Sequence, residues 1–188
     1  MATKIWTNAE TLTVADINAY ATNNGLKMIN ETSVSTSTVI SNVFTSVYEN
    51  YRIVGSNFNG AANLPLAVRL AVSGTPAVVN YNYGGMNVTT AGARTLFGAA
   101  ATTNFLIGYV GATASASTSF VLDIFRPQKT TATGFTCSSS SDIGTVLYMY
   151  QTSGNNTNAT AYDGIQFLHN LGGSAMTGTI RIYGYREA

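Results

Sequence analysis

The chain has 188 residues and a formal net charge of +1, and only 9% of its residues are charged. Such a chain lacks the cluster of basic residues that would neutralise the phosphates of a nucleic acid. Its longest apolar run, Phe105 to Gly111, is far shorter than the roughly 20 residues that a membrane span needs. We therefore expect neither a nucleic acid nor a membrane as a partner.

Small neutral polar residues replace the missing charge, with 27 Thr, 18 Asn and 16 Ser. A near-neutral surface promotes association, and charged groups are depleted at the cores of interfaces. We therefore expect much of the surface to contact other copies of the chain or a larger assembly. The single cysteine, Cys137, allows no internal disulfide and suits synthesis in a reducing cytoplasm. We expect no secretory leader, because Met1–Trp6 is followed by polar residues.

The first part of the chain has helical spacing, from Thr13 to about Glu31. Thr13 and Asp16 form a capping pair, and an apolar stripe consists of Val14, Ile17 and Ala21. Thr32 to Ser46 is rich in Ser and Thr and is expected to be an extended arm. We interpret residues 1–46 as an anchor of one short helix and this arm, and residues 47–188 as a β domain.

Beyond residue 47, short alternating runs are separated by Gly, Asn, Pro and Ser. These runs predict about eight strands, with no helical crossover between them: Tyr48 to Val54, Leu64 to Val72, Val78 to Tyr83, Asn104 to Val110, Ser119 to Phe125, Thr145 to Gln151, Gly164 to Leu168 and Gly178 to Tyr185. The pattern predicts a mainly β fold, an antiparallel β-sandwich of jelly-roll type.

The residues that carry chemistry in enzymes are sparse. No two of the eight carboxylates lie within five residues of each other along the chain, and His169 is the only histidine. One histidine excludes a multi-histidine zinc site, and we expect His169 to end a strand or lie in a turn. Cys137 has no basic neighbour and is expected to be a buried, inert thiol. We therefore predict no enzyme, no metal and no cofactor.

Aromatic and amide side chains gather in two stretches. Tyr81, Asn82 and Tyr83, together with Tyr148 and Tyr150, provide a surface of the kind that stacks on glycans, although half-buried sheet positions are the stronger expectation because Tyr is a favoured strand former. The tract from Gly154 to Thr160 is expected to be an exposed loop tip, with amides suited to sugar hydroxyls. Its candidate glycan contacts are Asn155, Asn156 and Asn158. We expect Tyr83-Gly84-Gly85 to be a turn or a bulge.

The opening stretch resembles the N-terminal segment of many tailed-bacteriophage virion proteins. In those proteins a Trp precedes an acidic residue, a helix start of the type Leu/Val-Thr-Ala-Ala-Asp-Leu-Asn, and a later Asn. The chain matches this pattern at Trp6, Glu10, Thr13, Ala15, Asp16, Asn18 and Asn24, while Val14 replaces the usual Ala. Because this segment precedes varied β domains in the family, the resemblance implies an attachment or assembly element.

The final stretch, Gly178 to Arg186, is similar to the last strand of phage fibre and decoration domains, which typically close with Gly-x-Ile-x-Ile-Tyr-Gly. Together the two ends imply a virion surface protein with an N-terminal anchor and a jelly-roll head. Members of this family are commonly homotrimers, so the resemblance also implies a trimer.

Three hypotheses follow. In the first, the protein decorates or cements a capsid, or forms a short head fibre. The major capsid protein or another virion protein would then bind the anchoring residues Trp6, Ile17, Tyr20 and Phe44. The alternative for these side chains is that they pack under the chain's own β domain. In the second, the protein is a tail-fibre tip whose Tyr81–Tyr83 strand and Asn155–Thr160 loop contact host surface glycans. In the third and weakest, it is a hydrolase that uses Asp123 or Asp163.

Overall fold

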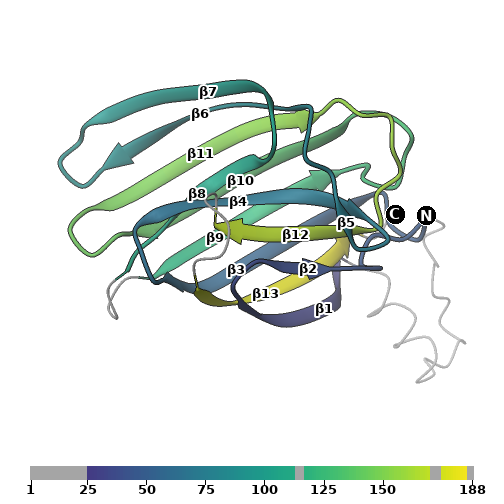
Figure 1. Cartoon of the computed structure of the whole chain (residues 1–188), viewed down its shortest axis with the longest axis horizontal. Coiled ribbons are helices and arrows are strands. Elements are labelled where there is room, and N and C mark those ends of the chain that lie inside the picture. Colours follow the sequence, from purple (N-terminus) through teal and green to yellow (C-terminus); the bar gives the residue numbers. More distant parts are fainter. Residues whose placement is uncertain (1–24, 113–116, 170–174, 186–188) are drawn as a thin grey trace, which may run out of the picture.

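The computed structural model describes residues 25–112, 117–169 and 175–185, which form thirteen β-strands (Figure 1). The strands are β1 (Leu26–Ser35), β2 (Thr38–Ile40), β3 (Asn50–Gly60), β4 (Leu64–Val72), β5 (Thr75–Pro76), β6 (Tyr81–Thr89), β7 (Arg94–Thr102), β8 (Phe105–Val110), β9 (Thr118–Phe125), β10 (Thr133–Asp142), β11 (Leu147–Asn156), β12 (Gly164–His169) and β13 (Met176–Tyr185). This part of the chain contains no helix long and apolar enough to cross a membrane.

The strands form two antiparallel sheets. The larger sheet has the order β1-β13-β3-β9-β10-β11-β6-β7, and the smaller has the order β2-β12-β4-β5, with β8 also paired to β4. Two sets of four, β1-β13-β3-β9 and β2-β12-β4-β8, have the strand order of a jelly roll. The predicted antiparallel jelly-roll sandwich is therefore confirmed, with β10, β11, β6 and β7 as an extension that doubles the width of the larger sheet.

The core lies between the two sheets and contains many aromatic side chains. The rings of Phe120 on β9 and Phe167 on β12 stack across the sheets with their centroids 6.0 Å apart. Phe105 on β8 stacks on Phe135 of β10 at 4.8 Å, which packs the smaller sheet against the extension. Strand alternation decides which residues enter this core, as on β13, where Ile180 and Ile182 are buried and the residues between them are not.

The segment from residue 25 to residue 46 corrects the expectation of a helix end followed by an arm. β1 pairs along its whole length with β13, and β2 pairs with β12. Val34, Ile40 and Val43 are buried in the core. The sandwich therefore begins at Leu26 in the described part of the chain, because the apolar residues scattered through the Ser/Thr-rich stretch fill core positions. The expected helix start lies in residues 1–24, outside the described residues, as do Trp6, Ile17 and Tyr20.

Each of the eight predicted strand segments overlaps an observed strand, and the predicted bounds Leu64 to Val72 coincide with β4. The prediction missed β1, β2, β5, β7 and β10. β7 and β10 are rich in Ala, Gly and Ser, which are not strong strand formers. β10 nevertheless pairs with β9 on one side and with β11 on the other. Tyr83-Gly84-Gly85 lies inside β6, where the register with β7 shifts between Tyr81 and Tyr83, so of the two expectations for this position the turn is wrong and the bulge agrees with the structure.

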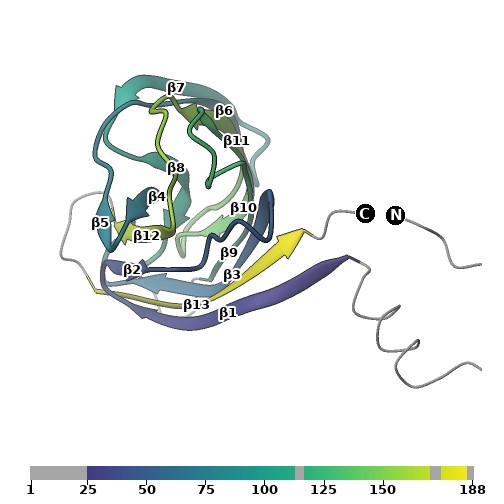
Figure 2. The same cartoon turned by 90° about the vertical axis from the view of Figure 1, so that its right-hand side faces the viewer.

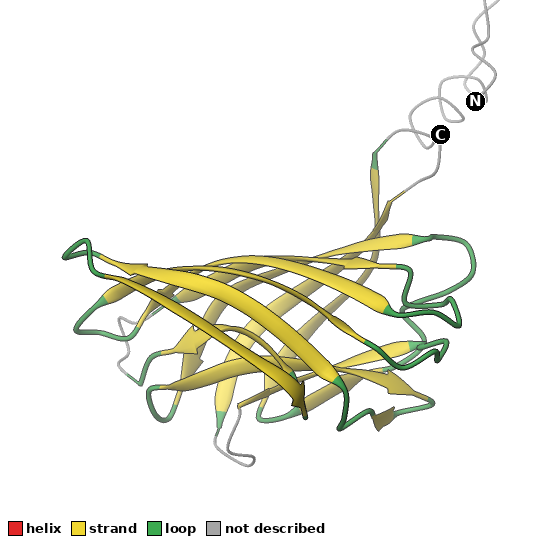
Figure 3. Ribbon diagram, turned by 90° about the horizontal axis from the view of Figure 1, so that it is seen from above, coloured by secondary structure: helices red, strands yellow, loops and turns green. Residues whose placement is uncertain are grey.

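The first and the last described strands end side by side. Leu26, the first residue of β1, pairs with Tyr185, the last residue of β13, and Figure 2 shows these two strands reaching out together. We call this the terminal end. The strands run from it to the opposite, distal end (Figure 3), where Asp142 pairs with Leu147 and Thr89 with Tyr148.

Candidate functional site

A groove opens at the distal end because the two sheets differ in width. The extension of the larger sheet reaches past β8, so part of the inner face of β11, β6 and β7 is not covered by the smaller sheet. Two adjoining cavities, of about 420 Å³ and about 180 Å³, occupy this space. Their lining consists of Asn63, Tyr83, Asn87, Thr89, Thr95, Phe97, Gly98, Leu106, Tyr109, Ile143, Tyr148 and Tyr150. The volume of the larger cavity lies within the range that is typical of small-molecule binding sites.

Tyr109 reaches the groove from the smaller sheet because β8 is irregular. The register of β4 with β8 shifts between Leu66 and Ala67, as in a β-bulge, and bulges redirect side chains. Two hydrogen bonds hold the backbone of Tyr109: its N–H donates to Ser141 Oγ at 3.1 Å, and the Thr118 hydroxyl donates to its carbonyl at 2.7 Å. The backbone that carries this side chain is therefore fixed from two strands of the larger sheet.

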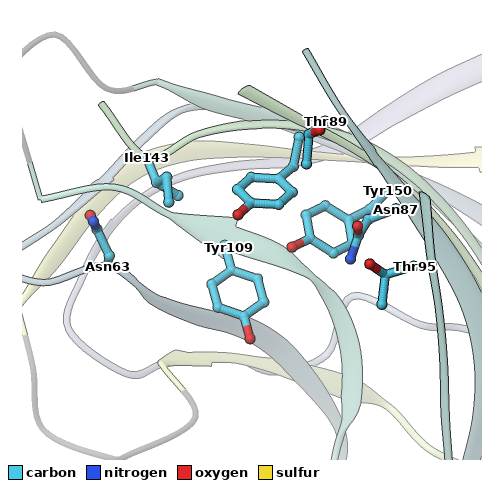
Figure 4. Close-up of a pocket in the computed structure, with 8 residues that line it drawn as sticks. Asn63, Asn87, Thr89, Thr95, Tyr109, Ile143 and Tyr150 are labelled. Atoms are coloured by element: carbon cyan, nitrogen blue, oxygen red, sulfur yellow. The ribbon is translucent and has the colours of Figure 1, made fainter. Parts of the chain in front are cut away.

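Tyrosine rings form one wall of the groove (Figure 4). Tyr150 stacks on Tyr109 with ring centroids 5.7 Å apart and an interplanar angle of 16°, and Tyr148 lies 5.7 Å from Tyr150 on the same strand. Phe97 contacts Tyr150 edge-on at 5.9 Å. Tyr150 is only 4% exposed. Burial, with smaller contributions from Tyr109 and Tyr148, raises the pKa of Tyr150 above its ordinary value, so its hydroxyl is protonated at neutral pH.

Neutral polar groups lie beside these rings. Asn87 on β6 and Thr95 on β7 are directly paired and point into the groove beside Tyr150 (Figure 4). Within the described residues, neither side chain has a hydrogen-bond partner, and the same holds for the hydroxyls of Tyr109 and Tyr150. Asn63 uses its carbonyl to accept the N–H of Ala112 at 2.7 Å. The lining contains no charged side chain among the residues described.

Glycine makes room for the aromatic wall on β6. Gly85 pairs with Phe97, and a Cβ at Gly85 would lie 2.9 Å from the ring of Phe97 and 2.3 Å from the carbonyl oxygen of Gln151. The missing side chain lets Phe97 cross the neighbouring strand, where it contacts Tyr83 at 6.5 Å as well as Tyr150. Gly85, which the sequence indicated as part of a turn or a bulge, is thus a packing residue of this wall.

Apart from Tyr148 and Tyr150, the predicted glycan residues lie elsewhere, with one exception. Tyr81 and Asn156 pair with each other at the terminal end of the sheet, and both are buried. The Tyr81 hydroxyl accepts the N–H of Leu70 at 2.7 Å, and Asn156 accepts a hydrogen bond from Tyr162 at 3.0 Å. Their expected exposure to a ligand is therefore corrected: both complete the core.

The other predicted amides bind one another. Asn82 donates to Asn155 at 3.2 Å across the β6–β11 pair, and Asn80 donates to Asn158 at 2.6 Å. Asn155 belongs to β11 rather than to a loop tip, so the tract from Gly154 is partly strand. Tyr83 is the exception, since it lines the groove together with Tyr148 and Tyr150. The sequence offered no local signal for Tyr109, Asn87 or Thr95.

Phe44 is not available as an anchoring residue. It is 1% exposed, and its ring lies 4.7 Å from that of Tyr51. Its backbone N–H donates to the Asp163 carbonyl at 3.0 Å. The alternative, that Phe44 packs under the chain's own β domain, is the correct one, because the segment that carries it belongs to the sandwich.

The titratable residues that we considered for catalysis have structural partners. Asp123 accepts two hydrogen bonds of 2.8 Å from Arg52 and one of 2.7 Å from Tyr185. Burial alone would raise the pKa of Asp123, but the hydrogen bonds and charge of Arg52, with the hydroxyl of Tyr185, lower it below its ordinary value. Asp163 accepts the N–H of Ser73 at 3.0 Å.

His169 is the last residue of β12, as expected, and Cys137 is buried. The Cys137 thiol donates to the Ile107 carbonyl at 3.6 Å, and burial raises its pKa. Among the described residues, no group of three or more His, Cys, Asp and Glu side chains is placed to hold a metal ion.

Comparison with known proteins finds no matching family model, no matching curated protein and no matching solved structure.

Proposed function

We propose that the chain is a non-enzymatic structural protein of a tailed-bacteriophage virion, attached through residues 1–24 and presenting the jelly-roll head at the virion surface. The partner of the attachment segment would be the major capsid protein or another virion protein. The N-terminal resemblance at Trp6, Asp16 and Asn18 supports this proposal. The observation that carries it is the position of Leu26 beside Tyr185 at the terminal end. An attachment segment that enters there leaves the distal end of the head free.

We also propose that copies of the chain associate through the outer face of the extension. Register places Met86, Val88, Leu96, Leu147 and Met149, the outer patch, on one face of β6, β7 and β11. Leu96 is 83% exposed and lies on β7, an unpaired edge of the larger sheet. Exposed apolar patches and open strand edges promote pairing with another chain. The occupant proposed here is a second copy, because the chain carries so little charge to oppose self-contact.

Light scattering of the purified protein tests the association and counts the copies, for which the resemblance implies three. Leu96→Lys is expected to lower the mass. Val47→Lys, at a residue that is 72% exposed in a turn away from the outer patch, is the matched control. A monomeric wild-type protein would contradict the proposal.

The second candidate function is a tail-fibre tip that contacts host surface glycans. It is favoured by the groove, which opens at the distal end, away from the point where the chain enters the head.

Immunogold electron microscopy tests the proposal and separates its two forms. Purified particles are labelled with a gold-conjugated antibody raised against the head. Labels spread over the capsid support decoration, and labels confined to the tail tip support receptor binding. Trp6→Ala combined with Tyr20→Ala is expected to abolish labelling, whereas Tyr183→Ala on the sheet surface leaves it intact. Particles without label would refute a virion role.

A further inference from the structure

We infer that the groove between β8 and the β11-β6-β7 extension is a binding site for a neutral saccharide, with Tyr109 and Tyr148 as the stacking residues, the buried Tyr150 packed against both, and Asn87 and Thr95 as hydrogen-bonding groups. The inference rests on the second candidate function and names its ligand class and its site. It replaces the stretch around Asn155 and Asn156 as the place of contact.

The aromatic wall is suited to the apolar face of a sugar ring. The C–H groups on one face of a pyranose are weakly positive and pack against the negative face of an aromatic ring. Tyr109 and Tyr148 are partly exposed, and the ring of each lies 5.7 Å from the buried ring of Tyr150, so Tyr150 supports the two rings that a ligand can reach. Because both rings pack against Tyr150 and two hydrogen bonds fix the backbone of Tyr109, less side-chain entropy remains to be lost when a ligand binds.

The polar groups beside the rings have free hydrogen-bonding capacity. Asn87 provides one acceptor and two donors, while Thr95 and the tyrosine hydroxyls each donate and accept. Within the described residues these groups have no protein partner, and Tyr150 is the most buried of them. A half-buried polar group that lacks a partner is satisfied by water or by a ligand, and sugar hydroxyls match the mixture of donors and acceptors.

The charge of the site selects among ligands. No Lys, Arg, Asp or Glu belongs to the lining described above. A phosphate, sulfate or sialic acid group would lose its hydration here without an opposite charge to replace it, which is costly. A purely apolar ligand would leave Asn87 and Thr95 without partners. A neutral oligosaccharide avoids both penalties.

The test is direct binding by the purified full-length protein, independent of any particle. Isothermal titration calorimetry is run with maltotriose, tri-N-acetylchitotriose and lactose as neutral probes, after a glycan array has been used to rank further neutral glycans. Sialyllactose serves as the acidic probe. We expect at least one neutral glycan to bind and sialyllactose to bind more weakly than lactose.

Variants locate the site. Tyr109→Ala and Asn87→Ala are each expected to weaken binding of the neutral glycan about tenfold, equal to about 1.4 kcal/mol. Thr95→Ala, at an exposed position on the edge strand, tests the groove without disturbing the core. Tyr183→Ala is the matched control, a tyrosine on the outer face of β13. Thermal melting confirms that each variant is folded.

The inference is overturned if no neutral glycan binds at millimolar concentration, if the acidic probe binds best, or if Tyr109→Ala, Asn87→Ala and Thr95→Ala all bind like the wild type. These results are separable from those of immunogold labelling. A protein that labels particles but binds no glycan refutes the groove alone, and one that binds a glycan but labels no particle refutes the virion role alone.

Discussion

The buried His169 side chain predicts a loss of stability in mildly acidic solution. Its ring is 2% exposed and packs on Gly60, where an added Cβ would lie 3.0 Å from the ring. Neither ring nitrogen has a hydrogen-bond partner among the described residues. Burial lowers the pKa of His169 below its ordinary value, because no neighbouring group compensates a positive charge there.

The sign and size of this pH-dependent change in stability follow from the linkage between proton binding and folding. The folded state holds the neutral imidazole, and the unfolded chain binds a proton near its ordinary pKa of about 6.5. The stabilisation is therefore complete above that pH and falls as the pH drops toward the folded-state pKa. Because His169 is a single titrating group, the free energy of unfolding falls by at most about 1.4 kcal/mol between pH 7.5 and pH 5.5. This limit applies if the His169 ring stays neutral in the folded state over the whole range.

The assay is urea denaturation followed by far-ultraviolet circular dichroism at several pH values between 5.5 and 7.5. The interval is favourable because the chain has a single histidine and ordinary carboxylates titrate below it. His169→Phe keeps an aromatic ring in the same space and cannot be protonated, so its stability is expected to be flat over this range. The reasoning is refuted if the wild-type free energy of unfolding is also flat, or if the variant keeps the same slope.

Two further predictions concern the packing and charges of the larger sheet. Gly55→Ala places a Cβ 2.1 Å from the ring of Phe120 and is expected to lower the free energy of unfolding, measured by thermal melting, by about 1–3 kcal/mol; adding Phe120→Leu should restore part of it. Gly84→Ala is the control, because the atom nearest to its added Cβ is 3.9 Å away. Equal melting temperatures of the two alanine variants would contradict the argument. Asp123→Asn removes the charge that binds Arg52 and Tyr185 and is expected to cost about 1–2 kcal/mol at pH 7. Since the pKa of Asp123 is lowered, the wild-type advantage should persist above pH ~4 and disappear as the pH falls through the folded-state pKa, and an advantage retained at pH 2 would argue against it.

Local patterns in the sequence were sufficient for the fold class. Alternation along segments such as Leu64–Val72 and Gly178–Tyr185 marks one buried and one exposed face, and this depends only on the two-residue period of a strand. The absence of long helical runs between these segments then favoured an antiparallel sandwich. Strands of weak pattern escaped prediction, because β10 is held by hydrogen bonds to β9 and β11 rather than by its own residue preferences.

The candidate site was beyond such local reasoning. The sequence indicated Tyr83, Tyr148 and Tyr150 as parts of an aromatic surface. It indicated Tyr81 and Asn156 as ligand contacts in the same way, but the hydroxyl of Tyr81 and the amide of Asn156 form hydrogen bonds in the core. Their burial depends on which strands cover them.

Composition and periodicity by themselves determined that this protein is a sparsely charged β-sandwich. Tertiary structure alone decided that Leu26–Ser35 is a strand, and that Tyr109 meets Tyr150 from a different sheet. The physical reason is that burial and pairing are set by partners far away in the chain. The groove exists only because one sheet is wider than the other, and no local sequence pattern predicts how many strands each sheet contains.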